Sequence, residues 1–336
     1  MTTAIPASLT GNLPAIEDAL RASLADGPDE LVHVSRYVMG WEDQAGAPLV
    51  TGGKRIRPAL CVFAAGLFGG SVEVALPGAV AVELIHNFSL VHDEVQDHDA
   101  ERHHRPTVWA LKGEGQAINA GDFLITRAFH ALLNGTGPVE RRMAALRILN
   151  EAMARMIAGQ WADISFETRE SVEPGEYLAM IRGKTGALLG APLAIGALLA
   201  GAEPAQAARL QEWGETVGLA FQVQDDYLGV WGDPNLTGKS NVNDIVRKKK
   251  TLPVVHGISS ARGAEIQALY ERESFSGADV ETVVAILESS GSDAFVRSEA
   301  ERLVQTANQM LTDFELPAHA VEQLRDVGRY LVERDR

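Results

Sequence analysis

The sequence lacks most of the marks of a secreted, nucleic-acid-binding or membrane-spanning protein. Its 336 residues include a single cysteine, Cys61, which excludes an intramolecular disulfide framework and favours a reducing compartment. The net charge is −15, so nucleic acid and anionic membranes, which both attract basic surfaces, are not expected partners. The amino terminus has no basic segment followed by an apolar one, so we expect no secretory signal and a cytoplasmic location.

Alternating runs of β-branched residues are also scarce, whereas apolar residues recur at three and four positions in nearly every segment. This pattern predicts an all-α fold. No low-complexity linker divides the chain, so we expect one domain over 1–336, and only the order of residues 1–12, which are polar and poorly periodic, is left open. The predicted helices span residues 14–25, 29–43, 54–68, 76–98, 115–133, 139–169, 175–185, 186–201, 204–232, 251–260, 263–272, 278–290, 293–314 and 317–334.

One apolar stretch imitates a membrane span. Residues 186–202 contain no charge over 17 positions, which is the lower limit for crossing a bilayer. Pro192 and four glycines interrupt the stretch, and no second span accompanies it. We therefore predict a helix that is buried on all sides, and no membrane span.

A concentrated acidic segment follows a long apolar run. Residues 90–107 read "LVHDEVQDHDAERHHRPT", directly behind "VAVELIHNFSL". Asp93 and Asp97 are one helical turn apart, so their carboxylates share a face and can converge on one cation. Taken alone, the segment supports a Mg²⁺ site and a solvated acidic face about equally.

A second acidic segment, residues 221–253, favours the metal. It sets Asp225 and Asp226 at the end of a mostly apolar helix and then runs through a Gly/Pro loop into the basic residues 247–250. Alone, the basic run reads as a solvated tail or a nucleic-acid patch. Together with the two acidic segments, the basic run has a different interpretation. If the two carboxylate clusters face each other across a cavity, they can hold Mg²⁺, and the Mg²⁺ and the nearby cations can hold a polyphosphate.

A third group of cations lies upstream. "GGKRIRP", residues 52–58, places Lys54, Arg55 and Arg57 at the start of a predicted helix. A helix amino terminus flanked by cations is a ready anion site. An ordinary capped surface helix is the favoured explanation of this stretch taken alone, and the anion site is favoured once the two acidic segments are considered with it.

The ordered set of motifs resembles the trans-isoprenyl diphosphate synthase family over nearly the full length. "DEVQD" and "RHHRPT" approximate that family's DDxxD and RRGxPT, and "FQVQDDYLG" approximates FQxxDDxxD. "GKRIRP", "GQ" at 159–160 and "GKT" at 183–185 are shared as well. The stretch "DDYLGVWGD", residues 225–233, resembles actinobacterial geranylgeranyl or polyprenyl diphosphate synthases.

The resemblance implies a helical bundle around a deep central cavity, a homodimer, and elongation of an allylic diphosphate with isopentenyl diphosphate. Three Mg²⁺ would be bound by Asp93, Asp97 and Asp225. The allylic diphosphate would be held by Arg102, Lys184 and Lys239, and isopentenyl diphosphate by Lys54, Arg57, His86 and, more weakly, His103. Thr185 and Gln222 would lie beside the reacting carbons, and Gln160 and Lys249 are further substrate-binding candidates.

Product length is inferred from the residues before the first acidic motif. Phe88 precedes Asp93 by five residues, about 7.5 Å along a helix, where it would form the floor of the cavity unless it is a plain core aromatic. An aromatic there, with the small Ser89 beside it, implies in this family a product of twenty carbons, geranylgeranyl diphosphate, made from farnesyl diphosphate.

Four positions depart from the family pattern. Glu94 replaces the middle aspartate of the first motif, and Gly229 replaces the last aspartate of the second, which leaves Asp225 and Asp226 as its ligands. His103 and His104 replace an arginine and a glycine. Because imidazole lacks the guanidinium fork, isopentenyl diphosphate should bind more weakly unless Arg105 or His104 substitutes.

These departures keep two alternatives open. One is a terpene cyclase that uses the same metal clamp without isopentenyl diphosphate, and the other is a catalytically silent partner subunit. Lys54, Arg57 and Thr107 oppose the cyclase, and the retained aspartates and lysines oppose the silent subunit.

Overall fold

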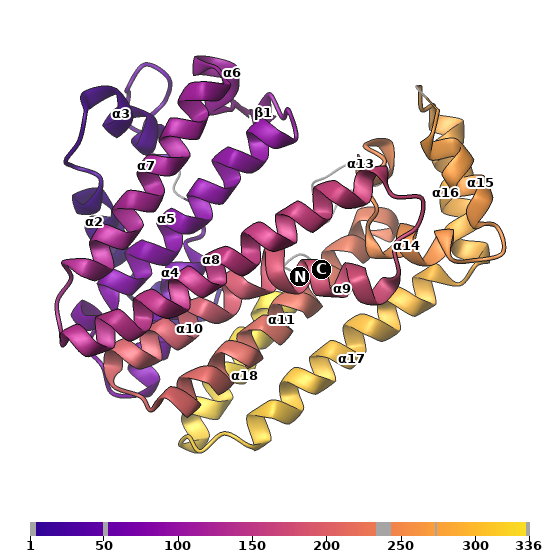
Figure 1. Cartoon of the computed structure of the whole chain (residues 1–336). Coiled ribbons are helices and arrows are strands. Elements are labelled where there is room, and N and C mark those ends of the chain that lie inside the picture. The colour runs from indigo at the N-terminus through magenta and orange to yellow at the C-terminus, as the bar shows by residue number, and fades with distance from the viewer. Residues whose placement is uncertain (1–4, 50–52, 233–242, 273, 334–336) are drawn as a thin grey trace. The chain divides into compact units, whose positions relative to one another are not determined.

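The fold is described by a computed structural model that covers residues 5–49, 53–232, 243–272 and 274–333 (Figure 1). Apart from one two-stranded hairpin and an isolated bridge, the regular structure in these ranges is helical. The elements are α1 Ala7–Thr10, α2 Leu13–Ser23, α3 Asp29–Val38, α4 Ile56–Leu67, α5 Val72–Gln96, β1 Glu101–Arg102, β2 Arg105–Pro106, α6 Val108–Lys112, α7 Glu114–Leu133, α8 Val139–Thr168, α9 Pro174–Ile181, the π-helical turn η1 Arg182–Gly186, α10 Ala187–Ala200, α11 Pro204–Trp231, α13 Asn243–Val246, α14 Leu252–Ile258, α15 Gly263–Tyr270, α16 Gly277–Ser289, α17 Ser292–Thr312 and α18 Ala318–Glu333.

The predicted all-α class is confirmed, and each predicted helix has a counterpart with boundaries a few residues away. The differences lie in short elements. α1, α6, α13 and the hairpin β1–β2 have too few residues to show a hydrophobic period. α1 falls within residues 1–12 and buries Leu9, so part of that stretch is ordered.

The chain forms two compact units, each discontinuous in sequence. Unit 2 comprises Ala7–Met153 and Ala191–Gln211, and unit 1 comprises the described parts of 1–6, 154–190 and 212–336. The single-domain prediction stays a prediction. The two units are described separately below.

Unit 2 is organised around α5, which runs beside α4 and α7 (Figure 1). Small residues allow close approach. A Cβ at Gly196 would lie 2.0 Å from the carbonyl oxygen of Cys61, so α10 packs directly on the backbone of α4. Burial of α5 is nearly complete along its middle, from Ala79 to Ile85. This burial explains why the polar residues that end α5 emerge from an apolar interior.

Two helical stretches are long and apolar enough to cross a membrane by length and composition, Val72–Gln96 and Pro174–Ala200. The most apolar window of each is 72% and 78% buried within the protein, respectively. Burial of this extent is typical of core helices, which agrees with the sequence interpretation of 186–202. The statement that no second stretch of this kind accompanies 186–202 is wrong, because Val72–Gln96 is one by length and composition.

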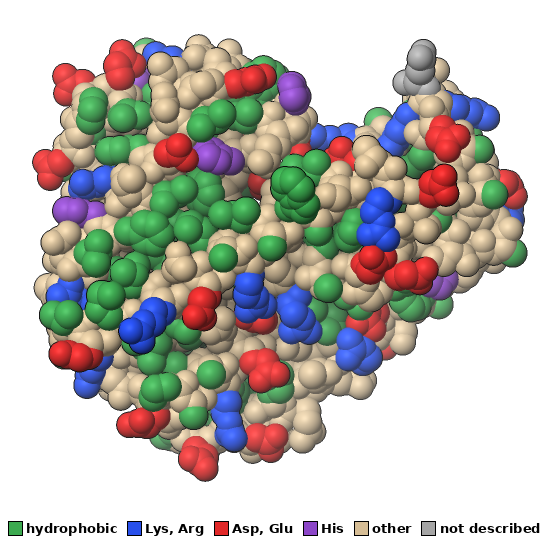
Figure 2. All heavy atoms as spheres, in the orientation of Figure 1, with side chains coloured by type: hydrophobic (Ala, Val, Ile, Leu, Met, Phe, Trp, Pro, Cys, Tyr) green, Lys and Arg blue, Asp and Glu red, His purple; other side chains and the backbone are tan. Residues whose placement is uncertain are grey.

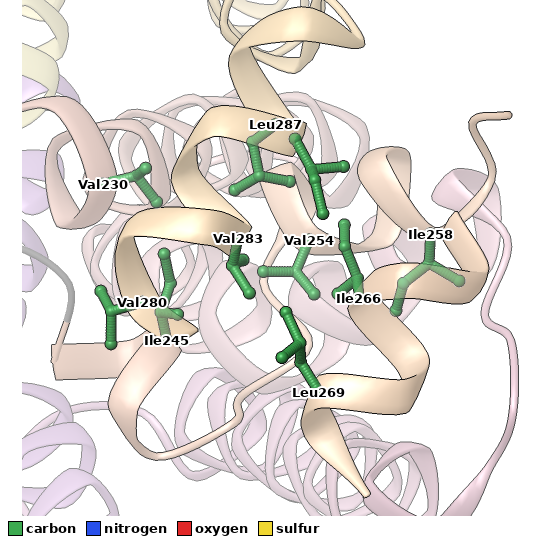
Figure 3. Close-up of a cluster of buried hydrophobic side chains, with 10 residues drawn as sticks. Val230, Ile245, Val254, Ile258, Ile266, Leu269, Val280, Val283 and Leu287 are labelled. Atoms are coloured by element: carbon green, nitrogen blue, oxygen red, sulfur yellow. The ribbon is translucent and has the colours of Figure 1, made fainter. Parts of the chain in front are cut away.

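Unit 1 carries a separate hydrophobic cluster, shown in Figure 3. It joins the end of α11 to α13, α14, α15 and α16. Val254 and Val283 lie at its centre, and both are fully buried. The cluster fixes α13 and α14 against the carboxyl-terminal end of α11, where the second acidic motif lies. Its buried members are Val230, Ile245, Val254, Ile258, Ile266, Leu269, Val280, Val283, Ile286 and Leu287.

Candidate functional site

The first acidic motif occupies the last turn of α5. Asp93 and Asp97 are both half-buried, and the backbone N–H of Asp97 donates to the carbonyl oxygen of Asp93 at 2.8 Å. This intact turn keeps the two side chains on one face of the helix. The motif therefore offers two neighbouring carboxylates that water and ligands can reach.

Glu94, between them, points elsewhere. Its side chain is 8% exposed, and its carboxylate lies 3.8 Å from Nε of Arg102. Burial raises the pKa of Glu94 to about 7, against the opposing effect of Arg102, while Asp99 and Asp93 raise it further. The glutamate is thus a buried neighbour of the candidate metal ligands and the partner of an arginine that is predicted to bind diphosphate.

Arg102 is presented by the hairpin β1–β2. Its two-residue loop, His103–His104, has positive φ at both positions, 50° and 59°. Such a loop favours Asn-Gly, so the glycine that the family pattern places at position 104 has a conformational reason, and histidine is among the better-tolerated substitutes. Both imidazoles are exposed.

Arg105 does not replace the lost guanidinium. Its Nη2 donates to the carbonyl oxygens of Tyr37 at 3.2 Å and Glu42 at 2.9 Å, and its guanidinium lies 4.1 Å over the Tyr37 ring. Tyr37 in turn donates its hydroxyl to the carbonyl oxygen of Pro106 at 2.6 Å. Arg105 therefore fastens the hairpin to α3 and the turn that follows it.

The basic group at 52–58 divides into two kinds of residue. Lys54 is exposed and Arg57 is half-buried, as an anion site requires. Arg55 is 6% exposed and forms ion pairs with Glu17 at 2.7 Å and Glu83 at 2.9 Å. Its pKa is raised because these carboxylates outweigh the effect of burial. The prediction that Arg55 belongs to the anion site is wrong, and α4 begins at Ile56, after it.

Three predicted site residues lie on α5 four to seven residues before Asp93: His86, Phe88 and Ser89. Burial lowers the pKa of His86 well below its usual value, and Arg57, Arg102 and Arg55 lower it further, so this imidazole is neutral at pH 7. Phe88 is buried and meets the His92 ring edge-on at 4.8 Å. Ser89 donates its hydroxyl to the His86 carbonyl at 2.7 Å, so it adds no free polar group beside Phe88.

In unit 1, the lysine of "GKT" lies in a π-helical turn. η1 packs so closely on α8 that a Cβ at Gly159 would lie 2.4 Å from the backbone nitrogen of Lys184, which explains the glycine of "GQ". Such turns occur often at functional sites. Lys184 donates to the carboxylate of Asp163, a residue that the sequence interpretation missed, while Gln160 on the same helix is buried.

The second acidic motif is anchored by its second aspartate. Thr185 donates to Gln222 at 3.2 Å, and Gln222 donates to Asp226 at 3.1 Å, so the two residues predicted to flank the reacting carbons are indeed joined. Asp226, 3% exposed, also accepts from the Tyr177 hydroxyl at 2.6 Å and the Leu252 backbone N–H at 3.1 Å.

Burial raises the pKa of Asp226 to about 7, although these three donors oppose the rise. A carboxylate that is buried and already accepts three hydrogen bonds is a structural anchor. The arrangement argues against a ligand role for Asp226, whereas Asp225 beside it is half-buried.

Gly229 has no side chain, and the space beside it is bordered by the carboxylate of another residue, Asp244. A Cβ at this position would lie 3.4 Å from Oδ2 of Asp244 on α13. A carboxylate therefore lies next to the place where the family's last aspartate would begin. The sequence interpretation missed Asp244 because it lies fifteen residues downstream, on a different helix.

The basic run 247–250 is partly structural. Lys248 donates to the carbonyl oxygen of Arg272, and Lys250 donates to the carbonyl oxygens of Phe166 and Arg169, near the end of α8. These two lysines satisfy backbone acceptors, so the run as a whole is not a phosphate site. Lys249 is half-buried and stays a candidate, and Lys239 lies outside the described residues.

The side chains of the two motifs decide whether the site can hold a metal ion. In residues 5–49, 53–232, 243–272 and 274–333, no group of three or more histidines, cysteines or acids could hold a metal ion. Two half-buried aspartates on one helical face are nevertheless the oxygen donors that Mg²⁺ uses when substrate phosphates complete its shell. The residues fit a Mg²⁺ that binds together with a diphosphate.

An all-α chain with two aspartate-rich segments, each at the end of a long, largely buried helix, defines the class of isoprenoid synthases. The family model for polyprenyl synthetase matches residues 41–287. A (2E,6E)-farnesyl diphosphate synthase of Mycobacterium tuberculosis is 42% identical over 308 residues, covering 90% of this chain and 85% of that protein.

A geranylgeranyl diphosphate synthase of the same organism is 40% identical over 291 residues, covering 85% and 82% of the two chains. The crystal structure of a polyprenyl synthetase from Streptomyces coelicolor superposes with a TM-score of 0.91 at 38% identity, covering 97% of this chain and 99% of that one. The chain belongs to the polyprenyl synthetase family, whose members lengthen prenyl diphosphates.

Proposed function

We propose that this enzyme condenses isopentenyl diphosphate with farnesyl diphosphate and releases geranylgeranyl diphosphate as its main product. The observation that carries the proposal is the pair Asp93 and Asp97, one turn apart at the end of a buried helix. Arg102 lies close by, with its Nε 3.8 Å from the carboxylate of Glu94. Two carboxylates and a cation in this arrangement suit a magnesium diphosphate better than either a bare metal or a bare anion.

Asp93, Asp97 and Asp225 are the proposed ligands of three Mg²⁺, and Asp244 is added as a supporting carboxylate because of its place beside Gly229. Bound Mg²⁺ would neutralise the charge that grows on the departing diphosphate. Because the protein's own acids repel a diphosphate, the site would stay weak towards either partner alone.

The cationic side chains would hold the two substrates. Arg102, Lys184 and Lys239 are the proposed contacts of the allylic diphosphate, and each positive charge there lowers the barrier to breaking the C–O bond. Lys184 starts from an ion pair with Asp163, so this carboxylate would keep the ammonium in place until substrate arrives.

Isopentenyl diphosphate would be held by Lys54, Arg57, His86 and His103, with Gln160 and Lys249 as further substrate contacts. A neutral His86 would offer an N–H to the diphosphate without adding charge. Thr185 and Gln222, linked to the anchor Asp226, would hold their oxygens rigidly beside the carbocation.

The choice of product depends on Phe88. We infer that its ring closes the cavity below Asp93, so that chain growth stops at twenty carbons. Phe88→Ala should move the product distribution to longer chains, read by reversed-phase chromatography of the dephosphorylated products. An unchanged distribution from a folded, active variant would exclude Phe88 as the floor. Ser89→Ala serves as a control, because its hydroxyl is spent on the His86 carbonyl.

A farnesyl diphosphate synthase is the second candidate, since a relative of that name is 42% identical. One experiment separates the alternatives. The purified chain is incubated with Mg²⁺ and labelled isopentenyl diphosphate, and with dimethylallyl, geranyl or farnesyl diphosphate as primer. A labelled twenty-carbon product from farnesyl diphosphate supports the proposal, and termination at fifteen carbons supports the second candidate. An unlabelled hydrocarbon indicates a cyclase, and no turnover indicates a silent subunit.

A homodimer in the cytoplasm completes the proposal. Hydrophobic side chains gather on the surface over α7 (Figure 2), where Ile118 is 44% exposed and Leu133 is 51% exposed. Val139 and Met143, at the start of α8, are also exposed. A second copy covering this surface would remove apolar area from water. Light scattering coupled to size-exclusion chromatography tests it, with Ile118→Lys expected to favour the monomer.

A further inference from the structure

A cavity lies in unit 1, lined by α11, α17 and α18. Its volume is about 790 Å³, within the range of small-molecule sites in proteins. The α11 residues that line it recur at three and four positions and include Trp213, Val217 and Trp231. This spacing defines one face of the helix.

That face is not the one that carries the proposed chemistry. Gln222 and Asp225 are absent from the lining, whereas Gln224 and Leu228 belong to it. Gln224 is rotated by about 200° from Gln222 around the helix axis. The cavity is therefore a separate site that the elongation reaction does not use.

The cavity is long, and its α11 wall is largely apolar. On α11 its lining runs from Trp213 to Trp231, which spans about 27 Å at the helical rise per residue. On α17 it runs from Arg297 to Leu311, about 21 Å. Small residues such as Ala220 and Ala307 leave space between the helices. A linear hydrocarbon chain fits this shape better than a compact ligand does.

The indole N–H groups of Trp213 and Trp231 are buried and have no hydrogen-bond partner among the residues that the structure describes. Trp213 is 1% exposed. Because neither indole nitrogen is exposed, the two tryptophans contribute the carbon atoms of their rings, and no hydrogen-bond donor, to the wall of the cavity.

Charged side chains line the cavity in two places. Arg297 donates to the Tyr227 hydroxyl at 2.8 Å, and its side chain is 58% exposed. Arg325 and Arg329 of α18 also line the cavity, but they pair with Glu322 and Asp326 on their own helix. Glu301 and Glu333 line it as well and disfavour a highly charged anion.

We propose that this cavity is a lipid site that takes one linear acyl or prenyl chain, with a singly or doubly charged anionic head beside Arg297 and Tyr227. The tail lies along the apolar face of α11. The site binds without Mg²⁺, because the head meets a hydroxyl group and a guanidinium.

Calorimetric titration of the purified full-length chain in EDTA tests the proposal with palmitate and farnesyl monophosphate as probes. Saturable binding with one equivalent of either probe supports it, and the stronger probe identifies the acyl or the prenyl source. Absence of binding by both probes overturns it. Inorganic phosphate, which has a head but no tail, should not bind measurably.

Two pairs of variants assign the binding to this cavity. Val304→Trp fills it, whereas Thr306→Trp places the same side chain on the same helix at an exposed position outside the lining. Val304→Trp should weaken binding by about tenfold or more, because a filled cavity cannot admit the chain, while Thr306→Trp should leave it unchanged. Equal binding by the wild type and Val304→Trp would place the probe elsewhere and overturn the proposal.

The head group is tested separately. Tyr227→Phe keeps the ring but removes the hydroxyl group, and should weaken both probes roughly three- to tenfold. Arg297→Gln should weaken both probes and leave farnesol, which has no charge, within about twofold of its wild-type affinity. Farnesol weakened as strongly as palmitate would contradict the placement of the head. Melting temperatures, measured without ligand, verify that each variant is folded.

Discussion

The two acidic motifs place their neighbouring carboxyl groups in the same way but support them differently. In each, the first acid, Asp93 or Asp225, is half-buried, and the next residue, Glu94 or Asp226, turns inward. Successive helical residues are about 100° apart, so one acid of an adjacent pair faces the site and the other faces the protein.

The support of the inward acid differs. Asp226 accepts hydrogen bonds from a tyrosine, a glutamine and a backbone N–H, whereas the ion-pair partner of Glu94 is Arg102, at 3.8 Å. Motif identity is thus a poor guide to role. The aspartate that matches the family pattern at 226 is structural, and the glutamate that departs from it at 94 lies beside a predicted substrate contact.

The outward acids should give the largest effects. Asp93→Asn and Asp225→Asn each remove a proposed magnesium ligand and should lower kcat by about 10³-fold or more, because charge on the leaving diphosphate is then poorly neutralised. The elongation assay with labelled isopentenyl diphosphate measures this. Asp122→Asn, an exposed acid on α7, is the control. A loss below tenfold in both variants would contradict the ligand assignment.

Substitutions of the two inward acids, Asp226 and Glu94, should differ in how much they lower the free energy of unfolding. Asp226→Ala leaves three donors without an acceptor and should lower the free energy of unfolding by about 2–4 kcal/mol, whereas Glu94→Gln should change it by less than about 1 kcal/mol. Urea denaturation gives both values. Tyr177→Phe, which removes one of the three donors, should cost about 1 kcal/mol. Equal costs for Asp226→Ala and Glu94→Gln would erase the distinction drawn between the motifs.

The role of Asp244 can be tested by removing its carboxylate and placing a new one at position 229. Asp244→Asn should raise the Mg²⁺ concentration for half-maximal activity by about tenfold, by analogy with other outer carboxylates of metal sites. Adding Gly229→Asp should restore it, because the new carboxylate begins 3.4 Å from the place of the old one. Gly229→Asp alone should fold normally. If the double variant were weaker than Asp244→Asn, the two positions would not be equivalent.

A smaller effect compares a histidine from each unit. The pKa values of His86 and His256 are both lowered, by burial in each case, with three arginines adding to the effect only at His86. The unfolded chain therefore binds protons more readily, and stability is lost as pH falls below about 6.5.

His86→Gln should flatten that loss by up to about 1.4 kcal/mol per pH unit, and more than His256→Gln does. Thermal unfolding between pH 7.5 and 5 measures both slopes, and identical slopes in wild type and His86→Gln would contradict a neutral His86.

Sequence reasoning predicted the long helices because each carries a hydrophobic period over three or more turns. It also brought Thr185 and Gln222 together correctly. It missed contacts that depend on tertiary packing, since the ion pairs of Arg55 and the donors of Asp226 come from segments remote in sequence. Basic residues were overcounted as ligand contacts for the same reason, because the lysines at 248 and 250 bind backbone carbonyls.

The three donors to Asp226 belong to α9, α11 and α14, which are separated by tens of residues along the chain. A nascent polypeptide cannot complete this junction before Leu252 has left the ribosome. Contacts of such long sequence separation form slowly, so the junction at Asp226 depends on segments that are synthesised after both motifs. Synthesis cut short ahead of α14 would yield a chain with every acid of both motifs but without the Leu252 donor to Asp226.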